Sequence, residues 1–204
     1  KRLSIVSYKL TVFQEMDQKK PTDISKPPQS EEESSTKVTN QLRPTRSRKA
    51  VAPPQRNLQK SHFESYHLAQ DYLHRAIGHL NAKHYPEAIS DFKIALQHNS
   101  ESAEAHFYLG LAYFMISDYQ KAKSAYQEAV VCEPGDATIH ENLGIVCQLL
   151  NQHSEAAQAF THAIALDPDQ AESYSRLGTS LLQLGKRDEA KAAYCQALLV
   201  KLQK

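Results

Sequence analysis

The sequence contains no tryptophan, only six glycines and only two methionines in 204 residues. Its three cysteines, Cys132, Cys147 and Cys195, are an odd number without C-x-x-C spacing, which argues against a disulfide framework or a zinc knuckle. We expect them to be small buried side chains inside helices. No stretch approaches the roughly 20 apolar residues that a membrane-spanning helix needs. Polar residues interrupt the apolar part of the first residues, unlike in a secretory signal.

Signatures of catalysis and of metal binding are also missing. The sequence has no H-E-x-x-H, no G-x-S-x-G and no glycine-rich phosphate loop. His74, His79 and His84 are five residues apart and therefore point in different directions around a helix. His106 and His140 occupy equivalent positions of an internal repeat, which indicates a role in packing. We predict that the chain is not an enzyme and uses no cofactor and no metal.

The net charge of +1 conceals two oppositely charged regions. Residues 1–60 contain 13 Lys/Arg and 6 Asp/Glu, a net charge of +7, whereas residues 61–204 contain 11 and 17, a net charge of −6. Such asymmetry usually separates a tail from a folded domain. From residue 17 to residue 60 the chain is rich in Lys, Ser, Pro, Gln and Thr and has almost no large apolar side chains. We therefore expect residues 1–60 to be a largely disordered tail.

Two parts of this tail carry their own signals. Residues 3–13 alternate between apolar and polar, which is the period of a strand. A single strand is not stable in water, so this segment either pairs with the sheet edge of a partner or acts as a short apolar docking peptide. A basic cluster, Arg43, Arg46, Arg48 and Lys49, is either a solvated linker or a site for nuclear import, nucleic acid or an acidic protein.

After residue 60 the sequence becomes helical and repeats itself at a fixed interval. Ser61 and Glu64 have the spacing of a capping box at a helix start. Three kinds of position recur at this interval: Ala88, Ala122, Ala156 and Ala190; Phe92, Tyr126, Phe160 and Tyr194; and Ala95, Ala129, Ala163 and Ala197. Agreement at all twelve positions indicates a true internal repeat.

The period, about 34 residues, and the motif resemble those of the tetratricopeptide repeat family. The family's Leu-Gly pair occurs at Leu109-Gly110, Leu143-Gly144 and Leu177-Gly178, and its proline at Pro134 and Pro168. The first repeat is degenerate, with Arg75-Ala76 and Ser100 at these places. The resemblance implies an all-α fold, a right-handed α-solenoid of antiparallel helix pairs, over residues 61–202. Its repeats would span about 69–102, 103–136, 137–170 and 171–204.

The same resemblance implies helices at about 62–82 with 85–98, 103–116 with 119–131, 137–150 with 153–166, and 171–184 with 187–200. We expect the three glycines of the Leu-Gly pairs to let two helix backbones approach closely. The four repeated aromatic residues are expected to fill the space between one repeat and the next. Asp136 and Asp169 precede first helices and are expected to cap them.

A partner-binding groove lined by the first helix of each repeat is a further implication of the family. It would be apolar at one end and polar at the other, which suits an extended peptide or an amphipathic helix. The alternative for Leu111 and Phe114 is simple packing against neighbouring helices. The residues expected in the groove are Leu73, Ile77, Phe107, Tyr108, Leu111, Phe114, Glu141, Asn142, Ile145, Glu172 and Arg176.

Members of this family that bind chaperone C-terminal tails use lysine, asparagine and arginine as a two-carboxylate clamp. Only Asn142 and Arg176 match that pattern here, and Phe107, Leu111 and Glu172 replace required polar or basic residues. We therefore predict no binding of such tails. Binding of nucleic acid through the basic cluster is disfavoured as the main role because the repeats are acidic.

The predicted function is that of a protein–protein interaction scaffold or adaptor within a larger assembly. The alternative is the regulatory portion of a larger enzyme or a chaperone-associated cofactor. Apolar residues near the C-terminus, Leu198, Leu199, Val200 and Leu202, predict self-association or continuation into a larger chain. The expected location is the cytoplasm, with ciliary, cytoskeletal and nuclear assemblies as alternatives.

Overall fold

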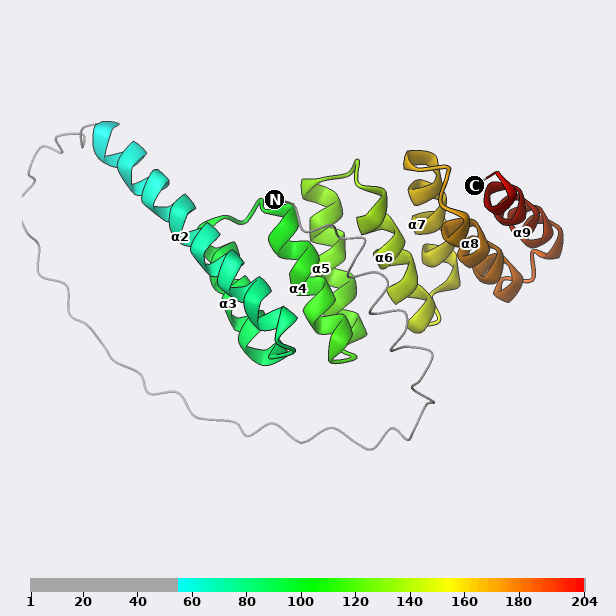
Figure 1. Ribbon diagram of the computed structural model, residues 1–204, viewed down its shortest axis with the longest axis horizontal. Helices are drawn as coiled ribbons and strands as arrows, with labels where there is room; N and C mark the ends of the chain where they lie inside the picture. Colours follow the sequence, from blue (N-terminus) through cyan, green and yellow to red (C-terminus); the bar gives the residue numbers. More distant parts are fainter. Residues whose placement is uncertain (1–54, 204) are drawn as a thin grey trace, which may run out of the picture. The chain divides into compact units, whose positions relative to one another are not determined.

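The computed structural model describes residues 55–203, and within this range it consists of helices joined by short turns. Residues 55–60, the end of the predicted disordered tail, are helical, which corrects the predicted boundary of the tail. The rest of the tail, with its strand-like segment 3–13 and the basic cluster, lies outside the described residues. Each helix packs mainly on its neighbours in sequence, so the helices form antiparallel pairs stacked in a row (Figure 1). The helices are α2 (Gln55–Asn81), α3 (Tyr85–His98), α4 (Ala103–Met115), α5 (Tyr119–Cys132), α6 (Ala137–Leu149), α7 (His153–Leu166), α8 (Ala171–Gln183) and α9 (Arg187–Leu202).

The predicted helix boundaries are confirmed to within two residues, with one exception at the start of α2. This helix begins at Gln55, directly after two prolines, and not at Ser61. Ser61 and Glu64 therefore lie inside the helix and do not form the expected start. The residues between Gln55 and Ser61 include neither glycine nor proline, so nothing stops the helix before the prolines. The first half of α2 projects beyond α3 (Figure 1).

The recurring alanines and aromatic residues form the core of the stack. Eleven of the twelve positions are buried, including Tyr126 and Phe160, which are almost completely enclosed. The exception is Tyr194, which is half-buried because no described helix follows α9 to cover it. Each pair of helices thus depends on the next for part of its burial.

The repeated glycines make room for an aromatic ring, not for a second helix backbone as expected. A Cβ atom on Gly144 would lie 2.7 Å from Cε1 of Phe160, in the second helix of the same repeat. The same collision would occur between Gly110 and Tyr126 at 2.8 Å. Tyr126, Phe160 and Tyr194 therefore pack against the glycine of their own repeat, whereas the expectation placed the aromatic residues between one repeat and the next. Phe92 lies between repeats as expected, because its ring stacks on Tyr108 of the next repeat with centroids 6.1 Å apart.

The turns inside the four helix pairs share one backbone conformation. Their second residues, at equivalent positions of the repeat, all have positive φ: Lys83 (63°), Ser117 (64°), Asn151 (58°) and Gly185 (78°). In the second repeat the amide of Ser117 donates to Phe114 and that of Asp118 to Tyr113, both at 2.9 Å. This is the Schellman pattern of helix termination, which requires a left-handed residue and favours glycine there.

We expect Ser117→Gly to raise the free energy of unfolding by about 0.5–1 kcal/mol, since the left-handed conformation strains a side chain with a Cβ atom. Gly185→Ala should lower it for the same reason. Urea unfolding followed by circular dichroism measures both changes. A loss of stability in Ser117→Gly would show that the hydroxyl matters more than the backbone strain.

Caps on the first helices are only partly as expected. Asp136 caps α6, because its Oδ1 accepts a hydrogen bond of 2.7 Å from the amide of Thr138. Asp169 does not cap α8, whose N-cap is Gln170 and has no side-chain cap bond. The helix begins one residue later than an Asp169 cap would need. Instead, the amide of Asp169 donates to Oδ1 of Asp167 at 3.2 Å.

The first repeat replaces an apolar contact by an ion pair. Arg75 donates two hydrogen bonds of 2.6 Å to Asp91, and the Asp91 side chain is only 9% exposed. The residues at the place of Arg75 in later repeats are leucines, and those at the place of Asp91 are alanines. The guanidinium holds the pKa of Asp91 below its usual value. A matched pair of changes therefore explains why this repeat departs from the family motif.

Arg75→Leu is expected to destabilise the protein because it leaves the Asp91 carboxylate buried without its partner. The double variant Arg75→Leu/Asp91→Ala should recover most of the loss, since it restores the leucine and alanine of the other repeats. The ion pair stabilises the fold above the unfolded pKa of about 4 and loses this effect as the pH falls below it. The double variant should thus lose less stability than the native chain between pH 5 and pH 3. Equal losses would contradict this role of the pair.

The cysteines are not all buried, contrary to expectation. Cys147 is buried, and burial raises the pKa of its thiol to about 11. Cys132 is partly exposed and Cys195 is exposed on α9. The last helix also exposes Leu198, Leu199 and Leu202, as its apolar sequence predicts.

Candidate functional site

The first helices of the pairs lie on the inner side of the stack. Helix α2 approaches α4, and α6 approaches α8, whereas α4 and α6, like successive second helices, make no approach of comparable extent within residues 55–203. A row of helix pairs bends toward the set of helices that lie closer together. Residues i, i+4, i+7 and i+11 share one side of a helix. We define the inner face by these residues: Glu104, Tyr108, Leu111 and Met115; Thr138, Asn142, Ile145 and Leu149; and Glu172, Arg176, Thr179 and Gln183.

The expected groove residues divide into two groups by burial. Glu172 is exposed, and partly exposed side chains are found at Ile77, Tyr108, Phe114, Asn142 and Arg176. Five others are buried and pack inside the repeats, which removes their side chains from the candidate surface: Leu73, Phe107, Leu111, Glu141 and Ile145. Leu111 therefore packs against neighbouring helices, as the alternative prediction for it stated, whereas the side chain of Phe114 is partly exposed.

Hydrogen bonds fasten α6 to α8 near the inner face. Nε2 of Gln148 donates to the backbone oxygen of Arg176 at 3.0 Å and to Oγ of Ser180 at 2.9 Å. On α8, Nε of Arg176 lies 3.2 Å from a carboxylate oxygen of Glu172. On α6, Nδ2 of Asn142 donates to the backbone oxygen of Thr138 at 2.8 Å. The polar part of the inner face is therefore held in place before any partner arrives.

Aromatic side chains fix the beginning of the inner face on α4. The ring of Phe107 packs on Tyr126 and on Tyr108, with centroid separations of 5.7 and 5.4 Å. At the other end of α4 the ring of Phe114 packs on Tyr119 at 5.8 Å. Tyr108 and Phe114 are thus rigid aromatic side chains with accessible surface, a combination that favours binding at low entropic cost.

Exposed apolar side chains collect at the C-terminal ends of the first helices. We call them the apolar row. Two of its members, Ile116 and Leu184, occupy equivalent positions of the repeat, and Leu150 occupies the same position in the repeat between them. This recurrence of apolar residues was the signal in the sequence from which the row could have been predicted. The row consists of Ile116 (45% exposed), Leu149 (38%), Leu182 (48%) and Leu184 (41%).

The equivalent histidines have a structural role in the described part of the chain. Nε2 of His106 lies 3.0 Å from the backbone oxygen of Ser100, and Nε2 of His140 lies 3.0 Å from that of Pro134. Both bonds reach six residues back and fasten the start of a first helix to the preceding turn. No group of three potential metal ligands comes together among residues 55–203. None of the helices α2 to α9 is both long and apolar enough to cross a membrane.

Comparisons with known proteins agree with this architecture. Models of the tetratricopeptide repeat match residues 73–137, 137–170 and 171–203. The chain therefore belongs to the tetratricopeptide repeat family, whose domains generally mediate protein–protein interactions. The matched models include no catalytic domain. The projecting half of α2 precedes the first match.

Solved structures of MamA resemble the described unit. One crystal structure of MamA is 26% identical, with a TM-score of 0.65 over 72% of this chain and 86% of that chain. Another is 28% identical, with a TM-score of 0.64 over 67% and 74% of the two chains. A third, at 19% identity and a TM-score of 0.63, covers 67% of this chain and 74% of that chain and shows the fold alone. A search among curated proteins found no match.

Proposed function

We propose that this chain is a scaffold or adaptor that binds a segment of a partner protein on the inner face of its repeats. The observation that carries the proposal is the combination of fixed polar groups and accessible apolar side chains on one side of three consecutive first helices. Asn142 and Arg176 are held by local bonds, and Tyr108 is held by its aromatic neighbour Phe107. A prearranged surface of this kind loses little entropy when it binds.

The chemistry of the same face argues against an acidic chaperone tail as the partner. Phe107 and Leu111 are buried apolar side chains where a carboxylate clamp needs lysine and asparagine. Glu172 lies beside Arg176, so it compensates the guanidinium and repels an incoming carboxylate.

Affinity capture with quantitative mass spectrometry tests the proposal. Asn142→Arg/Leu149→Arg places two bulky cations on the inner face of α6. The control, Gln127→Arg/Val131→Arg, makes the same kind of change on exposed positions of α5. We expect partners of the full chain to be retained by the control and lost by the inner-face variant. Retention of the same partners by both variants would contradict binding on the inner face.

The exposed leucines of α9 favour a second contact. Leu198 is exposed on α9, whereas the residues at its place in the earlier repeats, Leu96, Val130 and Ile164, are partly buried. We infer that another polypeptide segment or a second copy covers this helix. Sedimentation of the full chain with and without Leu198→Gln/Leu199→Gln measures whether a second copy does so.

A further inference from the structure

One side of α9 is more exposed than the same side of the earlier second helices. We call this side the α9 stripe; it consists of Lys191, Tyr194, Leu198 and Leu202, at helical positions i, i+3, i+7 and i+11. The first three are more exposed than the residues at their places in α5, which are Lys123, Tyr126 and Val130. The same difference holds against α3 and α7. The α9 stripe is therefore the surface that, in the earlier repeats, packs on the following repeat.

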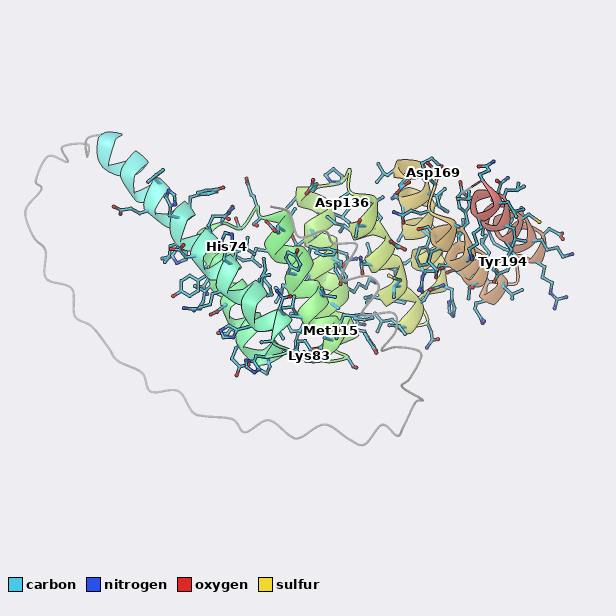
Figure 2. The ribbon with its side chains drawn as sticks, viewed as in Figure 1. His74, Lys83, Met115, Asp136, Asp169 and Tyr194 are labelled. Atoms are coloured by element: carbon cyan, nitrogen blue, oxygen red, sulfur yellow. The ribbon has the colours of Figure 1, made fainter. Side chains whose placement is uncertain are left out.

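A corresponding stripe is accessible on the first described helix. We call it the α2 stripe; it consists of Phe63, Tyr66, Gln70, His74 and Ile77, which are three or four residues apart and share one side of the helix. Phe63 is 65% exposed and Tyr66 is 49% exposed. His74 is exposed, whereas Tyr108, at its place in the next repeat, is partly buried. Figure 2 shows His74 and Tyr194 at opposite ends of the row of helices.

The contact between the first two repeats shows how two such stripes meet. The ring of Phe92 on α3 stacks on the ring of Tyr108 on α4, with centroids 6.1 Å apart and planes inclined by 9°. Tyr194 has the place of Phe92 in the last repeat, and His74 has the place of Tyr108 in the first. The imidazole of His74 is held in position, because its Nδ1 lies 2.8 Å from the backbone oxygen of Gln70. Tyr194 can therefore stack on His74 of a second copy in the same arrangement.

An ion pair between second helices supplies a further match. Nζ of Lys123 on α5 lies 2.6 Å from a carboxylate oxygen of Glu155 on α7. Lys191 has the place of Lys123 in the last repeat, and Glu87 on α3 has the place of Glu155 in the first. Lys191 also lies 3.9 Å from Asp188, but both side chains are almost fully exposed, so this contact holds the lysine weakly. Lys191 can therefore pair with Glu87 of a second copy as Lys123 pairs with Glu155.

The direction of the helices extends the match to apolar side chains. A second helix and the first helix that follows it run in opposite directions, so a step toward the C-terminus of α9 is a step toward the N-terminus of the helix packed on it. With Tyr194 beside His74 of a second copy, Leu202 comes to lie beside Tyr66 of that copy, eight residues away on each helix. Leu198 is 60% exposed and Leu202 is 83% exposed. The contact thus removes apolar surface from water on both copies.

We propose that the α9 stripe of one copy binds the α2 stripe of a second copy, so that the chains associate head to tail and continue the stack of repeats. This inference rests on the second contact of the proposed function and names its occupant. Three features in one register select the arrangement: equivalent rings, a lysine opposite a carboxylate, and exposed apolar side chains on both surfaces. Every copy has both stripes, so the contact can repeat from copy to copy in a row or a closed ring.

Sedimentation velocity of the full chain over a range of concentrations measures this association. Leu198→Gln/Leu202→Gln on α9 and Phe63→Gln/Tyr66→Gln on α2 should each weaken it by about tenfold or more, whereas Val131→Gln, at an exposed position of α5, should not. A mixture of the α9 and α2 variants is the decisive sample. The intact α2 stripe of one can bind the intact α9 stripe of the other, so the mixture should form a dimer although neither variant associates alone. Circular dichroism checks that each variant is folded.

Exchange of charges tests the register of the contact. Lys191→Glu and Glu87→Lys should each weaken association by about fivefold, because each change places like charges opposite each other. Both changes in one chain restore opposite charges and should recover the association of the native chain. Glu128→Lys, at an exposed position of α5, makes the same change in net charge as Glu87→Lys and should have little effect.

Several outcomes would overturn the proposal. Association that the α9 variant loses and the α2 variant keeps would indicate a contact between two α9 helices. A mixture of the two variants that stays monomeric, or a charge exchange that recovers nothing, would contradict the head-to-tail register. A native chain that is monomeric at every concentration, yet loses a captured partner in the α9 variant, would keep the second contact and remove the second copy from it. Binding on the inner face is decided separately, by Asn142→Arg/Leu149→Arg.

Discussion

Phe160→Ala is expected to lower the free energy of unfolding by about 3–5 kcal/mol. The Phe160 ring is completely buried and lies against Gly144, so its removal leaves a cavity between the two helices of the third repeat. Because the glycine has no side chain, it cannot fill that cavity. Chemical denaturation followed by far-ultraviolet circular dichroism measures the loss.

Tyr194→Ala provides the matched comparison for this prediction. Tyr194 occupies the equivalent position in the fourth repeat and contacts Gly178 in the same way, but its ring is only half-buried. Its removal should therefore cost clearly less than the removal of Phe160. Similar losses would mean that the cover supplied by the next repeat adds little to stability.

Gly144→Ala is expected to destabilise the protein by about 1–3 kcal/mol. The new Cβ atom would lie 2.7–2.9 Å from three atoms of the Phe160 ring, which is itself enclosed and cannot move away freely. The same substitution at Gly78 meets no atom within 4 Å. Gly78→Ala should therefore stabilise α2 by about 0.5–1 kcal/mol through helix propensity.

The expected changes in the free energy of unfolding have opposite signs for Gly144→Ala and Gly78→Ala, and this difference is what tests the contact between Gly144 and the Phe160 ring. A double variant, Gly144→Ala/Phe160→Leu, adds a second check, since the smaller side chain leaves room for the Cβ atom. Its loss should be smaller than the sum of the two single losses. If Gly144→Ala were as harmless as Gly78→Ala, the ring would not be packed against the glycine.

The fixed period of the sequence was sufficient to predict the helix pairs. The period predicts the pairs because each repeat packs its two helices with the same residue types at the same positions. Residues equivalent to Ala156 and Phe160 therefore identify the second helix of every repeat. The period also identified His106 and His140 as equivalent. The start of α2 could not be read in this way, because residues 55–68 precede the repeated part and Ser61 offered a plausible cap.

Side-chain burial on the inner face was the least predictable feature. Helical spacing places Glu141 and Ile145 on the expected side of α6, but the closeness of the neighbouring helices decides whether they remain accessible, and both are buried. The Arg75–Asp91 pair was missed as well, although a signal existed. Both positions are apolar in the other three repeats, and their simultaneous change to opposite charges indicates contact.

Hydrogen–deuterium exchange of the full chain, alone and with a captured partner, tests the central claim most directly. Binding on the inner face predicts slower exchange of amides in α4, α6 and α8, because a bound segment suppresses the local opening of these helices. Exchange in the outward-facing parts of α5 and α7 should change much less. Slowing confined to α5, α7 or α9, with α4, α6 and α8 unchanged, would contradict the claim that the first helices bind the partner.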